Sequence, residues 1–150
     1  MRRQLATSRR RWVLGILVAA IVVLAVGASQ GLAGASGKGT TVTTHYQRHN
    51  ESCGVDNGKQ FIGKARVTLS ADGTLGVKVD LRGADPGDYR VALFYADICQ
   101  PVDTIGYLEV GSDGTASRVF QKCCFSSGLY FLTLFNYNRN QDNDSLWFKL

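Results

Sequence analysis

The residues best suited to bind a metal ion lie close together in the sequence. His45 and His49 are the two histidines of the chain, and Cys53 follows four residues after the second. On a helix the two histidines would share a face and could hold one ion, with a free Cys53 as the third ligand. On a β-strand they would lie about 13 Å apart, too far to chelate one ion. Because we expect a strand here, we favour two solvent-exposed histidines near a domain edge over a metal site.

A second group of oxygen-bearing side chains lies near the C-terminus. Residues 138–145 form the most polar stretch of the chain, in which Asp142 and Asp144 could offer carboxylate oxygens to calcium. The spacing does not match an EF-hand loop, and the glycine that such a loop needs is missing. We therefore favour a solvated hairpin loop between the last two strands.

The chain contains four cysteines, Cys53, Cys99, Cys123 and Cys124. An even number in an exported protein predicts two disulfides. Neighbouring residues of an extended strand point to opposite faces, so we favour one of Cys123 and Cys124 pairing with Cys53 and the other with Cys99. The alternative is a vicinal Cys123–Cys124 disulfide beside a Cys53–Cys99 bridge. A vicinal bridge is strained and easily reduced, which would indicate a redox or switching role.

No catalytic motif stands out. The chain has no G-x-S-x-G sequence, no glycine-rich phosphate-binding loop and no Cys/His pair at the spacing of a known enzyme family. We therefore expect neither enzymatic activity nor a bound cofactor. Aromatic residues crowd the second half of the chain, and most belong in a core. Those left exposed among Phe131, Phe135 and Tyr137 would mark a binding surface for a protein or a glycan.

The N-terminal part of the chain has the pattern of an export signal. Five arginines precede an uncharged run of 17 residues, 12–28, and small residues follow it. The run is slightly long for a cleaved signal and just long enough to span a bilayer. Residues 1–28 are thus predicted to be either a signal peptide or a signal-anchor helix, followed by a Gly/Ala/Ser-rich tether at 29–40. Both alternatives place a domain of residues 41–150 outside the cytoplasm, secreted or anchored by the single N-terminal helix.

The positive charge of the chain belongs to this targeting segment. Of 17 Lys and Arg residues, five are the arginines that precede the apolar run, which leaves 12 against 12 Asp and Glu. A neutral domain with scattered charges lacks the electrostatic footprint of a nucleic-acid-binding protein, so we expect no nucleic-acid partner.

The remainder of the chain has the pattern of an all-β domain. Apolar and polar residues alternate with a period of two, and turn residues separate the segments at the spacing of a sandwich or barrel. Residues 128–137 are apolar on both faces, so this strand should lie in the interior of its sheet. We predict about eight antiparallel strands, at 41–47, 60–70, 74–82, 88–96, 104–110, 115–122, 128–137 and 145–150.

Two parts of this domain resemble each other at an offset of 41 residues. Residues 72–74 and 113–115 both read Asp-Gly-Thr, and Tyr89 aligns with Tyr130. We interpret the similarity as two equivalent three-strand units, each with an Asp-Gly hairpin turn followed by a longer corner.

The corner carries the most specific motif of the chain. Residues 85–91 (DPGDYRV) resemble the tyrosine corner of immunoglobulin-like Greek-key sandwiches, and residues 126–132 (SSGLYFL) repeat it loosely. The resemblance implies an antiparallel Greek-key β-sandwich in which each tyrosine hydroxyl bonds back to the preceding loop. It implies no activity, because such sandwiches carry many unrelated functions.

The sequence therefore predicts an exported, disulfide-stabilised β-sandwich that acts as a binding or structural module at the cell surface or in the medium. Its partner is an unspecified protein or glycan, and residues 12–28 would contact the membrane if they are not cleaved. Two other functions stay open. One is a thiol/disulfide redox protein using Cys123 and Cys124, and the other is an extracytoplasmic metal-binding protein using His45, His49 and Cys53.

Overall fold

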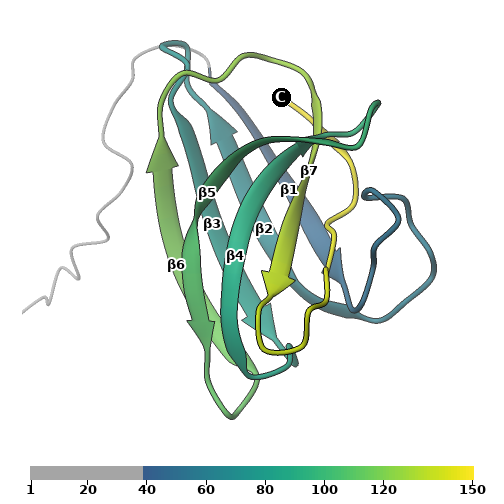
Figure 1. Cartoon of the computed structure of the whole chain (residues 1–150). Helices are drawn as coiled ribbons and strands as arrows, with labels where there is room; N and C mark the ends of the chain where they lie inside the picture. The colour runs from purple at the N-terminus through teal and green to yellow at the C-terminus, as the bar shows by residue number, and fades with distance from the viewer. Residues whose placement is uncertain (1–38) are drawn as a thin grey trace, which may run out of the picture. The chain divides into compact units, whose positions relative to one another are not determined.

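The computed structural model describes residues 39–150, which form an all-β domain of two antiparallel sheets (Figure 1). The predicted N-terminal helix, and the tether up to residue 38, lie outside the described residues. Within residues 39–150, no helix is long and apolar enough to cross a membrane.

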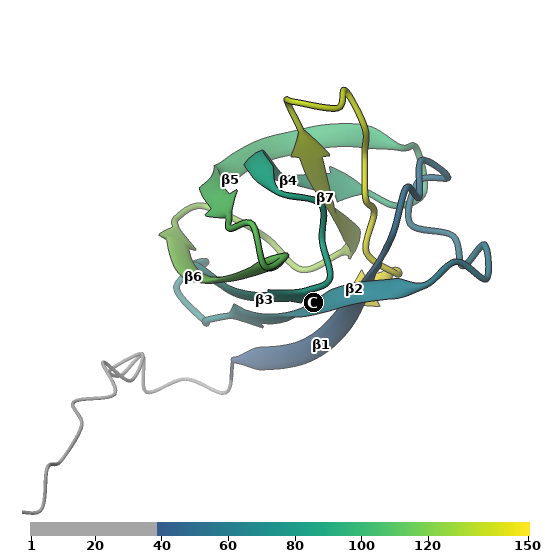
Figure 2. The same cartoon turned by 90° about the horizontal axis from the view of Figure 1, so that it is seen from below.

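Each sheet contains four strands. Sheet A has the order β1-β2-β3-β6 and sheet B the order β5-β4-β7-β8. The connections from β3 to β4, from β5 to β6 and from β6 to β7 cross between the sheets, which face each other in Figure 2. The strands are β1 (Thr40–Gln47), β2 (Phe61–Leu69), β3 (Leu75–Arg82), β4 (Gly87–Tyr95), β5 (Gln100–Val110), β6 (Thr115–Lys122), β7 (Leu129–Asn136) and β8 (Phe148–Lys149).

The predicted alternation of apolar and polar residues shows which side chains form the core. On β3, Val77, Val79 and Leu81 are buried between the sheets while Lys78 and the other charged residues of the strand point outward. Strand β7 pairs with β4 on one side and with β8 on the other, so its predicted interior position is confirmed. Both of its faces are buried because one packs in the core and the other is covered by a loop.

The hydrogen bonds predicted from the two corner motifs are both present. The Tyr89 hydroxyl donates to the carbonyl oxygen of Asp85 at 2.8 Å, and the Tyr130 hydroxyl donates to that of Ser126 at 2.9 Å. Each bond spans four residues and fixes the chain where it enters sheet B. Both tyrosine rings are buried in the core, so the bonds also satisfy polar atoms that would otherwise lie among apolar side chains.

The interpretation of the internal similarity as two equivalent units is confirmed for the two Asp-Gly turns. It is wrong for the strands that these turns connect. In both turns the aspartate carboxylate accepts a hydrogen bond from the backbone N–H two residues later, at 2.9 Å for Asp72 and 3.0 Å for Asp113. The first turn joins two neighbouring strands of sheet A, as a hairpin does. The second joins β5 of sheet B to β6 of sheet A. The difference arises because β6 pairs with β3, a partner far away in the sequence.

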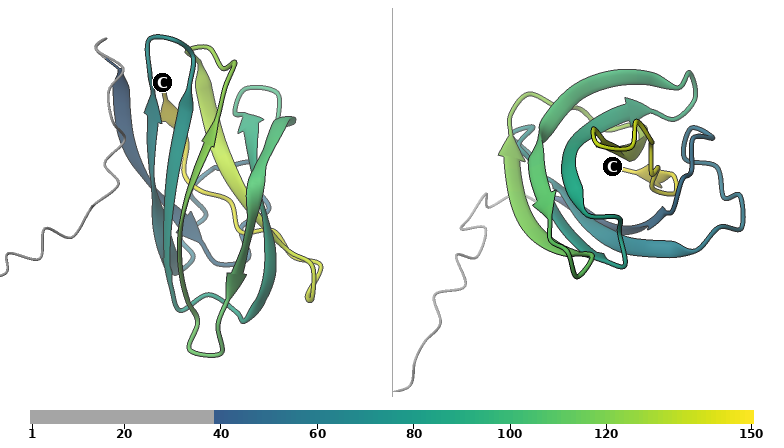
Figure 3. Two further views of the ribbon diagram at one scale, coloured as in Figure 1. Left: turned by 90° about the vertical axis from the view of Figure 1, so that its left-hand side faces the viewer. Right: turned by 60° about the horizontal axis from the view of Figure 1, so that its bottom comes forward.

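Residues 141–147, here called the C-terminal segment, close one side of the domain. The segment pairs with β7 through bonds such as Ser145 N–H to the Leu132 carbonyl, at 2.7 Å. It also pairs with β1, because the Gln47 N–H donates to the Asp144 carbonyl at 3.0 Å. The segment therefore connects the two sheets at the side opposite the β5–β6 edge (Figure 3).

The expectation of a solvated loop over residues 138–145 was wrong for its second half. Asn143, Asp144 and Ser145 are buried, although residues 138–140 are exposed as expected. The predicted last strand, 145–150, shortens to β8 because the C-terminal segment bonds to β1 and β7 at isolated positions rather than in a regular ladder. The side chains of Asn143, Asp144 and Ser145 are buried with hydrogen-bond partners from β7 and from residues 49 and 54, which satisfy their polar atoms.

Candidate functional site: a basic sheet face and two cysteine sites

The structure does not bring the proposed metal ligands together. His45 points outward from β1, and its ring lies 5.4 Å from that of Phe61. His49 lies beyond the end of β1, where its Nε2 is 3.1 Å from an Asp85 carboxylate oxygen. Cys53 is bound in a disulfide, so it offers no thiolate to a metal. Across residues 39–150, no three His, Cys, Asp or Glu side chains are placed to hold one ion.

Asp85 instead anchors a small surface network. It accepts a 3.0 Å hydrogen bond from Arg48, and Arg139 lies 3.8 Å away. The hydrogen bond from His49 and the nearby positive charges of Arg48 and Arg139 hold the pKa of the Asp85 carboxyl below its usual value. The network fixes the turn after β1 against the Tyr89 corner, which is a structural role.

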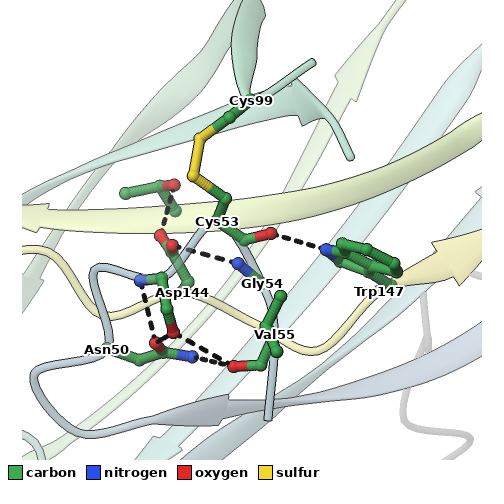
Figure 4. Close-up of a disulfide and its surroundings, with 9 residues drawn as sticks. Asn50, Cys53, Gly54, Val55, Cys99, Asp144 and Trp147 are labelled. Carbon is green, nitrogen blue, oxygen red and sulfur yellow. Dashed lines mark hydrogen bonds between the residues drawn. A yellow bond between two sulfur atoms is a disulfide. The ribbon is translucent and has the colours of Figure 1, made fainter. Parts of the chain in front are cut away.

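The disulfide joins Cys53 to Cys99, with their Cα atoms 5.5 Å apart (Figure 4). The favoured pairing of these residues with Cys123 and Cys124 was therefore wrong. It assumed an extended strand through the vicinal pair, but β6 ends at Lys122 and Cys124 has a positive φ of 75°. A residue in this left-handed conformation breaks the alternation of side chains, so the two neighbours no longer point to opposite faces.

The bridge holds the loop of residues 48–60 over the outer face of sheet B. Gly54 lies so close to β7 that a Cβ there would be 2.6 Å from Trp147 Cδ1 and 2.7 Å from Phe131 Cβ. The indole N–H of Trp147 donates to the Cys53 carbonyl at 2.5 Å (Figure 4). Phe131 is only 1% exposed as a result, whereas Phe135 is half-buried and Tyr137 is exposed. Phe131 therefore cannot belong to the exposed aromatic surface that the sequence suggested.

Asp144 lies beneath this loop as a buried carboxyl group. One carboxylate oxygen accepts from the Thr133 hydroxyl at 2.7 Å and the other from the Gly54 N–H at 3.2 Å (Figure 4). Burial, together with the negative charge of Asp142, raises the pKa of Asp144 to about 6. Both oxygens are used to hold the loop against β7, so the carboxyl group serves the structure rather than a calcium site.

The outer face of sheet A is a candidate binding surface. Four cationic side chains project from β2 and β3, away from the core, and all four are exposed. An open hollow of about 1040 Å³ lies on this face. We give the name basic face to the set of His45, Phe61, Lys64, Arg66, Lys78, Asp80 and Arg82. All of these residues except Arg66 line the hollow.

Strand register sets the electrostatics of the basic face. Arg66 lies directly opposite Lys78 across the β2–β3 pair, an arrangement that disfavours folding by about 0.2–1 kcal/mol. Asp80 is the one carboxylate of the set, with an oxygen 3.4 Å from Lys78 Nζ. A hydrogen bond from Ser117, and then the charges of Lys78 and Lys64, hold its pKa below the usual value. One carboxylate against four cations leaves a net charge of +3 on the face.

Three of these cations have no ionic partner. Within residues 39–150, Lys64, Arg66 and Arg82 form no ion pair. The neutral total of the domain hides this separation of charge, because acidic residues gather elsewhere. On sheet B, for example, Asp88 lies directly opposite Glu109. The alternation of charged and apolar residues in β2 and β3 could have pointed to the basic face, but the register that aligns the two strands is not visible in the sequence.

Comparison with protein-family models, with curated proteins and with solved structures finds no match for this chain.

Proposed function

We propose that this chain is an exported, disulfide-stabilised binding module whose basic face binds an anionic polysaccharide outside the cytoplasm. The observation that carries the proposal is the group of three cations, Lys64, Arg66 and Arg82, that share one exposed sheet face without ionic partners. A surface of this kind attracts a polymer that carries repeated negative charges, because three of its four cations form no ion pair within the described domain and the face has a net positive charge.

The shape of the face favours a sugar polymer. His45 and Phe61 form an aromatic pair at one end of the hollow, and the Phe61 ring is 48% exposed. An exposed aromatic ring offers an apolar surface on which the face of a sugar ring can stack. The hollow is open and extends over several strands, which suits a linear chain better than a compact small molecule.

The remaining parts of the proposal are compatible with the disulfide and with the sequence. A Cys53–Cys99 bridge suits an oxidising compartment, and the predicted export segment would deliver the domain to one. We include in the proposal the immunoglobulin-like, Greek-key class of sandwich, supported by the two tyrosine-corner bonds and by the pairing of β3 with β6 across the intervening β4 and β5. We propose no catalytic role.

The test is binding of the full chain to dextran sulfate, with uncharged dextran of the same length as the reference polymer. Exposed ionic contacts contribute about 0.7 kcal/mol each, so the K64Q/R66Q/R82Q variant should lose about 2 kcal/mol, or about 30-fold in affinity. The affinity of the unchanged protein should fall as the salt concentration rises. F61A should weaken binding further at high salt, where the stacking contribution remains.

The matched control removes the same charge elsewhere on the domain. The K59Q/R139Q/K149Q variant loses three exposed cations that lie outside the basic face, so it should bind dextran sulfate nearly as well as the unchanged protein. An equal loss in both variants would show attraction by net charge and would contradict a specific face. Binding of single-stranded DNA as tight as that of dextran sulfate would contradict the choice of a polysaccharide.

A further inference from the structure

The proposed binding function makes no use of the two exposed cysteines, Cys123 and Cys124. Both are exposed, and both have free thiols in the structure. Their Sγ atoms lie 2.7 Å apart, about 0.7 Å more than the length of a disulfide bond. The pair lies between β6 and β7, in the connection that crosses from sheet A to sheet B.

The residues on either side hold the pair in place. Lys122 donates to the Thr104 carbonyl at 2.8 Å and forms a 2.6 Å ion pair with Asp103. After the pair, the Phe125 N–H donates to the Gly73 carbonyl at 3.0 Å, and the Phe125 side chain packs against the core. Because both flanks are anchored, the approach of the two sulfur atoms is a property of the fold rather than of a loose loop.

A small hollow lies beside the two sulfur atoms. It has a volume of about 190 Å³, and its walls include Tyr95 and Tyr130, whose rings stack at 5.5 Å. Asp103 adds a carboxylate at the rim. The hollow is large enough for the arm of a small thiol compound but not for a folded domain.

We propose that Cys123 and Cys124 form a thiol–disulfide exchange site for small disulfides of the type R–S–S–R. This activity is separate from polysaccharide binding, since the cysteines lie outside the basic face. The two thiols come close enough to react in sequence with one disulfide, and the hollow receives the departing R–S group.

The exchange proceeds in two balanced steps. The Cys123 thiol loses its proton and its sulfur attacks one sulfur of R–S–S–R, which forms a mixed disulfide and releases one R–SH with that proton. The Cys124 thiol then loses its proton and attacks the Cys123 sulfur, which forms the vicinal bond and releases the second R–SH. The protein is oxidised by two electrons and the small disulfide is reduced.

The order of the steps follows from the contact between the thiols. The hydrogen bond with Cys123 and the charge of Cys123 raise the pKa of Cys124, which suits Cys124 to the second step. Cys123 is therefore the attacking residue and Cys124 the resolving residue. The Cys53–Cys99 bridge joins the loop of residues 48–60 to the β4–β5 turn and has no free thiol, so it takes no part.

The experiment treats the reduced pair in the full chain with oxidised glutathione and counts free thiols by mass after alkylation in denaturant. The unchanged protein should lose both thiols together and retain no glutathione. C124S should instead retain one glutathione on Cys123, because the resolving thiol is missing. C123S should likewise retain one glutathione, on Cys124, because that thiol then also lacks a partner to complete the exchange.

Two results would overturn the proposal. One is an unchanged protein that retains a glutathione on each cysteine, since this would show that the thiols react independently. The other is a C124S variant that retains no glutathione, since Cys123 would then not attack the small disulfide. The C123S/C124S variant is the control for folding: it should keep the Cys53–Cys99 bridge and the near-ultraviolet circular dichroism of the unchanged protein.

Discussion

Replacing the buried Asp144 with asparagine should change the dependence of stability on pH in a specific direction. The pKa of this carboxyl is raised from 3.8 to about 6 in the folded protein. The folded state therefore binds the proton more tightly than the unfolded state does. Stability from this group is fully present below pH 4 and is lost as the pH rises through about 6.

The size of the effect follows from the same two values. A difference of about 2.2 pH units corresponds to about 3 kcal/mol of stability, lost between about pH 4 and pH 7. The asparagine side chain would not titrate, but its bonds to Thr133 and to the Gly54 N–H would be weaker by about 1 kcal/mol in total. D144N should thus be about 2 kcal/mol more stable than the unchanged protein at pH 8 and about 1 kcal/mol less stable at pH 4.

Urea unfolding at intervals from pH 4 to pH 8 would measure this difference, because contributions from all other groups cancel between the two proteins. D113N is a suitable control. The backbone and hydroxyl of Thr115 hold the pKa of Asp113 below its usual value, so this exposed group stabilises the fold at neutral pH and its removal should have the opposite sign. A stability difference between D144N and the unchanged protein that stays constant with pH would refute the reasoning.

Three further changes test the fold and the basic face. Y89F removes the 2.8 Å bond to the Asp85 carbonyl and should cost about 1 kcal/mol in urea unfolding; no loss would contradict a stabilising corner. C53S/C99S opens a loop of 46 residues and should cost about 4 kcal/mol by the chain-entropy relation, so an unchanged melting temperature would argue against the bridge. R66E creates an opposite-charge pair with Lys78, so it should raise stability by about 0.5 kcal/mol while weakening dextran sulfate binding; a loss of both, measured by unfolding and titration, would point to simple misfolding.

Features of the fold that depend on local sequence could be predicted. Alternation within β3 showed which side chains face the core, and the Asp-Gly turns formed the same hydrogen bonds in both places. The tyrosine corners followed from motifs of seven residues, because the bond from Tyr89 reaches only four residues back. Such features were predictable because the interacting groups lie within one turn or one strand.

Features that depend on distant partners could not be predicted. Strands β5 and β6 lie in different sheets because β6 pairs with β3. The pairing of Cys53 with Cys99 depends on the position of the loop of residues 48–60 on sheet B. Asp144 looked like a loop residue because burial of a carboxyl group is costly unless hydrogen bonds satisfy it. Its partners, Thr133 and Gly54, lie 11 and 90 residues away, so no local pattern around Asp144 indicates them.

The basic face depends both on local sequence and on distant partners. Each strand alone shows outward charged residues at alternate positions, which a solvated sheet surface tolerates. The register then places Lys64 opposite Asp80 but Arg66 opposite Lys78, and the face keeps a net positive charge, although an acidic residue in place of Arg66 or Lys78 would stabilise the sheet. Nothing in the packing of the described domain requires this arrangement, because both side chains point away from the core. Because this arrangement slightly weakens folding and serves no packing role, we propose for it a ligand that carries repeated negative charge.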